Sequence, residues 1–214
     1  MNIFRWIKIK KELKNFREFK KNYKFDYKEI KKNDDGTESV DGICIKDECG
    51  EIINSENDIF INVGYANKGS SLAKCLSNLF PYKFYFKGFF VDSVESVIQS
   101  LKFKDKKNQR LVFDYSGLNS NRVKACSDYD WKISQTVFFQ GMQIERDSRQ
   151  YDEFIDEIYC SLIQNNLFRN ALKNVGNRYI LHSIGNENKK ETLLSRYEFE
   201  RELNCIKDYV LLKK

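Results

Sequence analysis

The sequence contains little proline, glycine or histidine. Its 214 residues include one proline, ten glycines and one histidine. So few turn-forming residues argue against an all-β sandwich with many tight turns. A lone histidine without a Gly-x-Ser-x-Gly motif gives little support to Ser/His/Asp catalysis. No Gly-rich phosphate-binding loop is present, so a phosphate would have to meet helix N-termini or basic side chains instead.

Long apolar runs are also missing. No stretch approaches the ~18–20 apolar residues of a membrane span, and no apolar segment behind the lysine-rich start resembles a secretory signal. We therefore expect a cytoplasmic protein without membrane contact. The six cysteines are scattered, and only Cys44 and Cys49 lie close together. This spacing favours reduced thiols over a zinc site, and no metal or other cofactor is expected.

Apolar and charged residues are both abundant. Hydrophobic residues make up 41% of the chain and aromatic residues 14%, which is enough to form a sizeable core despite a charged fraction of 32%. The positive charge is concentrated at the start, where residues 1–32 hold twelve Lys/Arg and four Asp/Glu. Residues 1–55 are therefore predicted to be a basic extension with short β-like segments, followed by a single domain at 56–214.

The basic segment itself has a helical pattern. Apolar residues recur at positions 9, 13, 16 and 19, which predicts an amphipathic helix. Such a helix could bind along a nucleic-acid backbone through its lysines. It could equally pack on the domain and leave the lysines in solvent, and the sequence favours this second alternative.

The domain reads as α+β, mainly helical with a small sheet. Ser148 and Ser195 are positioned to cap two long helices, and Ser195 forms a capping box with Glu198. Gly176 is placed to end a shorter helix at 167–174. Residues 110–115 fit either a strand or a helix. Strands are predicted at 59–63, 82–91 with a turn at 87–88, 136–139 and 178–184.

The most informative segment is a predicted helix over residues 92–104. Glu95, Gln99 and Lys102 are spaced by four and three residues, which aligns them along one stripe of the helix. The neighbouring stripe is apolar, with Val94 and Leu101. A carboxylate, an amide and an ammonium at the edge of a buried face are costly unless they are paired or used in chemistry.

These residues and the sequence around them resemble the NADAR family, which has the YbiA-like fold. The resemblance lies in Leu76-Ser-Asn-Leu-Phe-Pro, the aromatic strand that follows, and the Glu-x3-Gln-x2-Lys-Phe pattern from Glu95 to Phe103. A weaker second block covers the helix near Tyr151 and the strand with His182. A Trp-Gly pair that many members carry after the histidine is replaced here by 185–190, which holds no tryptophan.

The resemblance implies an N-glycosidase that cleaves the ribose–base bond of a ribosylated or ADP-ribosylated base, with ADP-ribosylguanine in nucleic acid or nucleotide favoured. Glu95 would be the acid/base or electrostatic stabiliser, and Lys102 the nucleophile or leaving-group partner. The predicted substrate-binding residues are Ser77, Asn78, Phe80, Gln99, Phe103, Tyr151 and His182.

Each of these residues also has a purely structural interpretation. Glu95 could cap the first helical turn, Lys102 could be solvated, and the aromatic residues and His182 could belong to the core. Two other functions remain open at this stage. One is a module that binds ADP-ribose or a nucleotide without cleaving it, and the other is a nucleic-acid-associated protein that uses residues 1–32.

Overall fold

The computed structural model describes residues 3–65, 70–115, 117, 119 and 130–213. Within these ranges helices predominate, and the strands form one three-stranded and three two-stranded sheets. The predicted α+β class with a helical majority is therefore confirmed. The strands are so short that the single small sheet we expected is divided into separate pieces.

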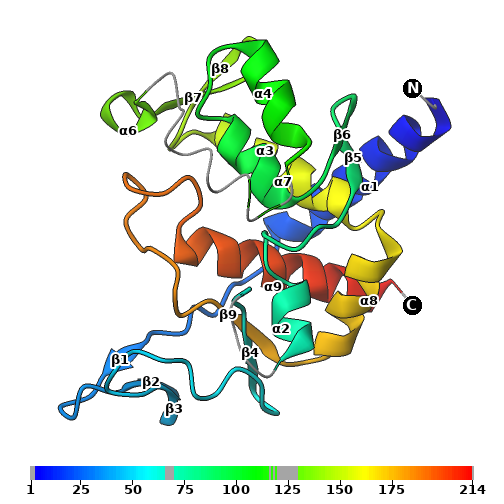
Figure 1. Cartoon of the computed structure of the whole chain (residues 1–214). Helices are drawn as coiled ribbons and strands as arrows, with labels where there is room; N and C mark the ends of the chain where they lie inside the picture. Colours follow the sequence, from blue (N-terminus) through cyan, green and yellow to red (C-terminus); the bar gives the residue numbers. More distant parts are fainter. Residues whose placement is uncertain (1–2, 66–69, 116, 118, 120–129, 214) are drawn as a thin grey trace.

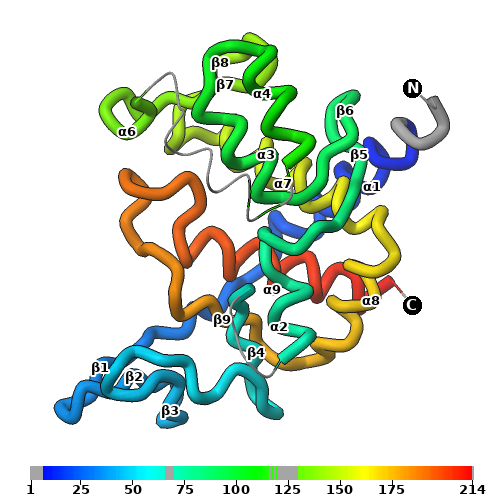
Figure 2. Tube along the Cα trace, viewed as in Figure 1, coloured from blue at the N-terminus to red at the C-terminus, as the bar shows by residue number. Residues whose placement is uncertain are grey.

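The elements follow one another along the chain as traced in Figure 2. The first part contains α1 (Ile3–Lys21), β1 (Lys31–Lys32), β2 (Glu38–Val40), β3 (Ile43–Lys46), β4 (Phe60–Asn62), α2 (Ser71–Cys75), β5 (Phe84–Phe86), β6 (Phe89–Val91), α3 (Val94–Ser100) and α4 (Lys106–Phe113). The second part contains α6 (Trp131–Ser134), β7 (Thr136–Phe139), β8 (Met142–Glu145), α7 (Arg149–Leu162), α8 (Asn166–Val175), β9 (Tyr179–Leu181) and α9 (Arg196–Leu212).

Helix α9 runs through the middle of the molecule, and α1, α7 and α8 pack against it (Figure 1). The predicted caps are confirmed: Ser148 caps α7, and Ser195 forms the capping box of α9 with Glu198. Helix α7 buries the apolar face that its periodicity predicts. The buried residues of this face are Tyr151, Phe154, Ile155, Ile158, Leu162 and, just past the helix end, Ile163.

The amphipathic helix predicted near the start of the chain is α1, and it packs into the body. Ile9 and Phe16 are buried, and Leu13 and Phe19 are partly buried against the same core. Near its end, Lys20 forms ion pairs with Asp156 of α7 and Glu202 of α9. Of the two alternatives for this segment, the structure therefore shows the packed helix.

Strand β4 pairs in parallel with β9, although the two are far apart in sequence. This pairing sets the end of β4 beside the end of β9, where His182 follows. The predicted hairpin of β5 and β6 is also present, with Lys87 and Gly88 at positive φ in its turn. Two-residue turns of this kind favour a left-handed backbone that matches the twist of the strands.

The helix expected at 92–104 is shorter than predicted. Helix α3 ends at Ser100, and the chain continues as a turn in which the Lys102 and Phe103 amides donate to carbonyls three residues back. Such bonds tighten the end of a helix without reversing the direction of its side chains. Asp105 then caps α4, which takes up most of the ambiguous segment from residue 110.

The cysteines at 44, 49, 75, 160 and 205 are free thiols, whereas Cys126 lies outside the described residues. Cys160 and Cys205 are buried as small apolar side chains, in agreement with the expectation for scattered thiols. None of the described helices is long and apolar enough to cross a bilayer.

Candidate functional site

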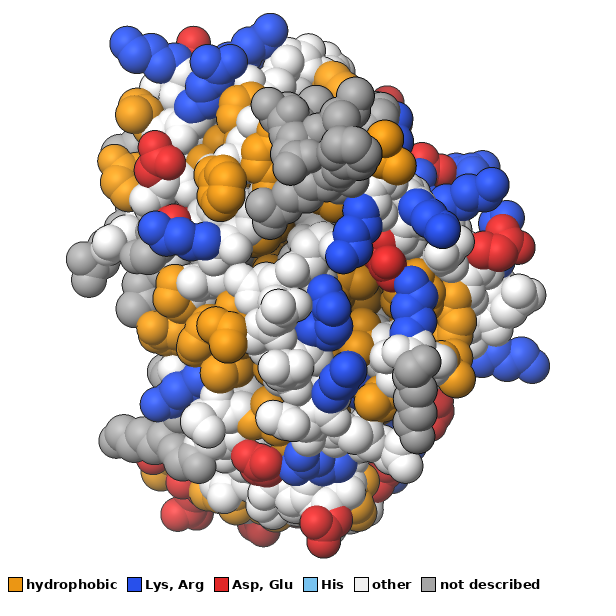
Figure 3. All heavy atoms as spheres, turned by 90° about the vertical axis from the view of Figure 1, so that its right-hand side faces the viewer, with side chains coloured by type: hydrophobic (Ala, Val, Ile, Leu, Met, Phe, Trp, Pro, Cys, Tyr) orange, Lys and Arg blue, Asp and Glu red, His pale blue; other side chains and the backbone are white. Residues whose placement is uncertain are grey.

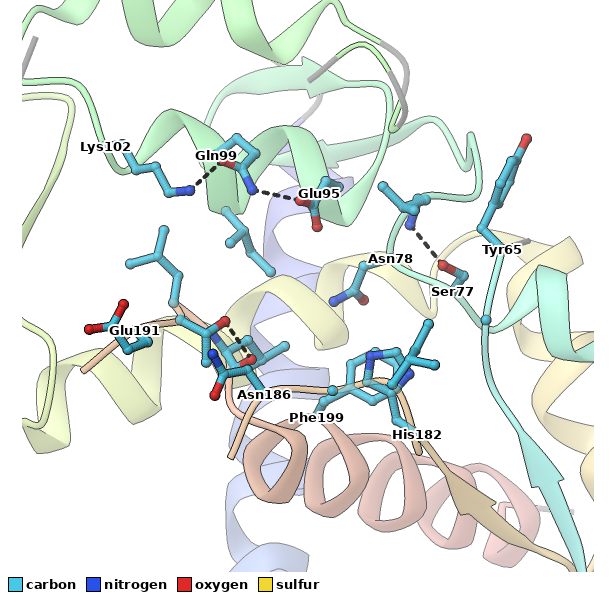
Figure 4. Close-up of a pocket in the computed structure, with 18 of the residues that line it drawn as sticks. Tyr65, Ser77, Asn78, Glu95, Gln99, Lys102, His182, Asn186, Glu191 and Phe199 are labelled. Carbon is cyan, nitrogen blue, oxygen red and sulfur yellow. Dashed lines mark hydrogen bonds between the residues drawn. The ribbon is translucent and has the colours of Figure 1, made fainter. Parts of the chain in front are cut away.

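A pocket of about 430 Å³ lies between α3, the segment after β9 and the start of α9 (Figure 4). Segments from across the sequence contribute to its wall. The lining residues are Gly64, Tyr65, Ser77, Asn78, Leu79, Glu95, Ile98, Gln99, Lys102, Trp131, Lys132, His182, Ile184, Gly185, Asn186, Glu191, Thr192, Leu193, Leu194 and Phe199.

Helix α3 supplies one wall through a chain of hydrogen bonds. The Lys102 ammonium donates to Gln99 Oε1, and Gln99 Nε2 donates to Glu95 Oε1, each across 2.6 Å (Figure 4). The ammonium only donates and the carboxylate only accepts, so the two charges fix which way the Gln99 amide faces. The three side chains that share one predicted stripe therefore meet along one side of the pocket.

The rest of α3 holds this wall in place. Val94, Ile98 and Leu101 are buried on the neighbouring stripe, as their spacing predicts. The helix is capped by Ser93, whose hydroxyl accepts from the Ser96 amide in a capping box. Because Ser93 and Ser96 do the capping, the carboxylate of Glu95 meets Gln99 instead of closing the first turn.

The turn at 77–79 docks on the start of α3. The Glu95 amide donates to the Asn78 carbonyl (3.0 Å), and the Leu79 amide donates to Ser77 Oγ (3.2 Å). The buried hydroxyl of Tyr159, on α7, donates to Asn78 Oδ1 (2.8 Å). Burial raises the pKa of Tyr159 well above its usual range, so this hydroxyl stays protonated. Asn78 points into the space between α3 and α9 in Figure 4.

His182 faces the pocket from the end of β9, opposite α3. Its Nδ1 lies 2.9 Å from the Val63 carbonyl oxygen, which only accepts, so Nδ1 carries the proton and Nε2 is the acceptor. Burial, with the Arg196 and Lys46 charges nearby, lowers the pKa of His182 to about 4. The imidazole is therefore neutral at pH 7. It packs on Phe199 with ring centroids 4.5 Å apart.

Gly185 lies close against this histidine. A Cβ at this position would come within 2.8 Å of His182 Cδ2 and 2.9 Å of Arg196 Cβ. Real Cβ atoms do not approach other heavy atoms so closely, so a larger residue would displace the imidazole. Glycine at 185 therefore fits the close passage of the chain over His182.

The segment 191–194 is held by a buried ion pair outside the pocket. Arg146 forms two hydrogen bonds with Glu198, of 2.9 and 2.6 Å, and its Nε donates to the Thr192 carbonyl (3.2 Å). The Tyr151 hydroxyl donates to the Leu193 carbonyl, and the Arg146 guanidinium lies over the Tyr151 ring. Two-point pairing of this kind fixes both distance and orientation.

Six of the nine predicted site residues line the pocket: Ser77, Asn78, Glu95, Gln99, Lys102 and His182. Phe80, Phe103 and Tyr151 do not. Phe80 packs on Tyr82, with ring centroids 4.5 Å apart, and Phe103 is buried beyond the end of α3. Tyr151 is buried behind the wall, where its hydroxyl holds segment 191–194. Direct substrate contact is therefore not proposed for these three aromatic residues.

Sequence reasoning missed the contribution of α6. Trp131 and Lys132 both line the pocket, and Lys132 forms an ion pair with Glu191, which also lines it. The signal in the sequence was Asp130, whose side chain caps this four-residue helix by accepting from the Lys132 amide. Within the described ranges, no group of three or more His, Cys, Asp or Glu side chains is arranged to hold a metal ion.

Known proteins match this chain over the same region. The family model described as bacteriophage protein GP30.3 matches residues 70–208, which include every predicted site residue. The uncharacterized 17.1 kDa protein in the Gp30–rIII intergenic region of enterobacteria phage T4 is 31% identical over 135 residues, covering 62% of this chain and 88% of that protein. The NMR structure of the E. coli protein YbiA matches with a TM-score of 0.49 and 13% identity, over 74% of this chain and 88% of that chain. Because the family model spans more than half of the sequence, this chain belongs to the bacteriophage protein GP30.3 family.

Proposed function

We propose that this protein is an N-glycosidase that cleaves the bond between a ribose and a base, with an ADP-ribosylated guanine as the favoured substrate. The proposal rests on one observation above all. Glu95, Gln99 and Lys102 form a continuous hydrogen-bonded line along one wall of a pocket. Their sequence pattern, which resembles that of the NADAR family, supports the same reaction class.

The reaction needs the two charges at either end of that line. As the glycosidic bond breaks, positive charge builds on ribose C1 and the bonding electrons move to the base nitrogen. A carboxylate near the ring stabilises that positive charge or transfers protons, and this is the role of Glu95. Lys102 attacks C1 as nucleophile after losing a proton, or else hands a proton to the departing base.

The remaining lining suits a ribose and its base. The volume of about 430 Å³ falls within the range of small-molecule sites, which is ~300–1,000 Å³. Asn78, Ser77 and Asn186 offer hydrogen-bonding groups for ribose hydroxyls, and Trp131 brings an indole ring to the wall. Polar groups make up most of this lining, and Trp131 and Ile98 add apolar contact, which suits a ligand that carries both hydroxyl groups and a flat base.

The test is a mass-spectrometric assay with ADP-ribosylguanosine, ADP-ribosylthymidine, NAD and a ribosylaminopyrimidine. We expect release of the base from at least one substrate, and a loss of about 100-fold or more in rate for Glu95→Gln and for Lys102→Ala. Asp92→Asn and Lys104→Ala are matched controls, because neither residue lines the pocket, and they should retain the wild-type rate.

Borohydride added during turnover distinguishes the two roles of Lys102. A covalent adduct on Lys102 identifies it as the nucleophile, since a Schiff base with the opened ribose is reduced and trapped. Wild-type turnover in Glu95→Gln or Lys102→Ala would contradict the proposed site. Calorimetric binding of ADP-ribose without any product from the panel would instead identify a binding module.

A further inference from the structure

A second hollow, of about 200 Å³, lies on another face of the molecule, between α1, α8 and the end of α9. Figure 3 looks onto this face and shows Lys and Arg side chains gathered around a depression with an apolar floor. The residues that line it are Lys8, Glu12, Ile163, Gln164, Arg169, Lys173, Val210 and Lys213. None of them lines the pocket beside α3 that forms the candidate functional site, here called the α3 pocket.

Four of these residues are cations and one is an acid. Lys8 comes from α1, Arg169 and Lys173 lie one turn apart on α8, and Lys213 follows α9. Like charges gathered around a small hollow repel one another, which lowers stability unless an anion is bound. Glu12 supplies one negative charge, so the site keeps an excess of positive charge.

Two of the cations are positioned by the protein. Arg169 donates through Nε and Nη2 to the Ile163 carbonyl, at 3.0 and 2.8 Å. Lys213 pairs with Glu12, and its ammonium lies 4.4 Å from the centre of the Tyr209 ring. Burial would raise the pKa of Glu12, but hydrogen bonds from Lys213 and Tyr209 hold it below its usual value. The carboxylate therefore stays charged.

We infer that this hollow binds a backbone phosphate of a nucleic acid, seated by Lys8, Arg169, Lys173 and Lys213. The hollow is smaller than a typical nucleotide site but suits one phosphate group. Positive charge continues beyond it, since Lys11 and Lys14 are exposed at three-residue steps along α1 from Lys8. A row of cations that leads into a hollow suits a nucleic acid, because each nucleotide carries one negative charge on its phosphate.

This inference is independent of the proposed glycosidase activity. It predicts which lysines contribute to nucleic-acid binding. If the basic start of the chain bound nucleic acid simply by its charge, Lys31 and Lys32 would contribute as much as Lys8. The hollow predicts that Lys173, from a distant part of the sequence, contributes and that Lys31 and Lys32 do not. Both of these strand lysines are exposed on β1.

The test compares two double variants of the full chain that remove equal charge. Binding of labelled 20-mer single- and double-stranded DNA is measured between 50 and 300 mM salt. For Lys8→Ala with Lys173→Ala we expect binding about tenfold or more weaker at 100 mM salt, and a salt slope smaller by about 1, as the loss of one phosphate contact predicts. Lys31→Ala with Lys32→Ala should bind as the wild type does.

Three results would overturn the inference. The first is an equal loss of DNA binding in both double variants, which would show that binding depends on the overall positive charge and not on the hollow. The second is the absence of DNA binding by the wild-type chain. The third is binding to phosphatidylserine vesicles, but not to DNA, that depends on Lys8 and Lys173, because the surface would then serve a membrane. Circular dichroism of each variant confirms that these exposed substitutions leave the fold intact.

Discussion

Gln99 connects the two charged residues of the α3 wall. It is almost completely buried, and a buried amide is costly unless its donors and acceptors are used. Here the acceptor meets Lys102 and a donor meets Glu95. Gln99 is therefore a positioning residue that holds an ammonium and a carboxylate in a fixed relation.

Replacing Gln99 by leucine should lower turnover of the proposed substrate by about 10- to 100-fold and change the shape of the pH–rate profile. The apolar side chain removes both hydrogen bonds, so each charged group meets a different environment. Gln143→Leu, at an exposed position on β8, is the control and should keep the wild-type profile. A loss of rate with an unaltered pH profile would indicate a merely structural role.

The free energy of unfolding should depend on pH in opposite directions through two titratable residues, the partly buried His182 and the buried Glu202. Burial lowers the pKa of His182 to about 4 from its ordinary 6.5. The stability that the neutral imidazole gives the folded state is therefore lost as the pH falls from about 6.5 towards 4. Burial, assisted by the Asp156 charge, raises the pKa of Glu202 despite Lys20. Glu202 changes the free energy of unfolding in the other direction. Because its pKa is raised on folding, it stabilises the folded state more as the pH falls.

We therefore expect His182→Gln to gain about 2 kcal/mol in its unfolding free energy, relative to the wild type, when the pH is lowered from 7 to 5. Glu202→Gln should lose stability relative to the wild type over the same interval. Urea unfolding of the three proteins at pH 7 and pH 5 measures both slopes. Parallel pH dependences in all three would show that neither group titrates as described.

At the scale of elements, the pocket depends on how α9 begins. The capping box of Ser195 and Glu198 starts the helix, and the same Glu198 pairs with Arg146 behind segment 191–194. One carboxylate thus links the helix start to the loop that lines the pocket. A buried pair with both partners present is tolerated, whereas losing one partner leaves an uncompensated charge.

Arg146→Met should lower the unfolding free energy by about 3–5 kcal/mol, because Glu198 remains buried without its guanidinium. Adding Glu198→Gln to this variant should restore part of the loss, since the uncompensated charge is then gone. Chemical denaturation of the two single variants and the double variant completes the cycle. Strictly additive effects would mean that the two residues do not interact.

The sequence predicted the elements whose caps and apolar periodicity agree. Helices α7, α8 and α9 have clear start signals or a glycine stop, and the α3 stripe placed Glu95, Gln99 and Lys102 together. Helix α6 was not predicted, because its four residues are too few to show a helical pattern of apolar residues. The positions of segment 191–194 and of Tyr151 follow from contacts with distant residues, which no local pattern reveals.

At the scale of the whole molecule, the basic start of the chain is a structural component. Phe16 of α1 is fully buried, and Lys20 bridges α7 and α9 through Asp156 and Glu202. The start of α1 and the end of α9 lie on the same side of Figure 1, where α1 and α8 flank the end of α9. The positive charge of α1 therefore cannot be removed by truncation without disturbing the core.

Deleting residues 1–24 should destabilise the protein by several kcal/mol, because it exposes the core around Phe16 and leaves Asp156 and Glu202 without Lys20. Thermal unfolding monitored by circular dichroism measures the loss. Lys11→Ala and Lys14→Ala are controls at exposed positions and should change stability by less than about 0.5 kcal/mol. A truncated chain with an unchanged melting temperature would show that α1 is dispensable.

The parallel pairing of β4 and β9 has a consequence for synthesis on the ribosome. Val63 and His182, which meet beside that pairing, are 119 positions apart. Contacts of such long range form late, after the entropy of closing the intervening loop has been overcome. A nascent chain that has emerged only as far as α8 has β4 without its partner and no imidazole beside it. Ligand binding in the pocket beside α3 should therefore be acquired only after β9 and α9 have left the exit tunnel.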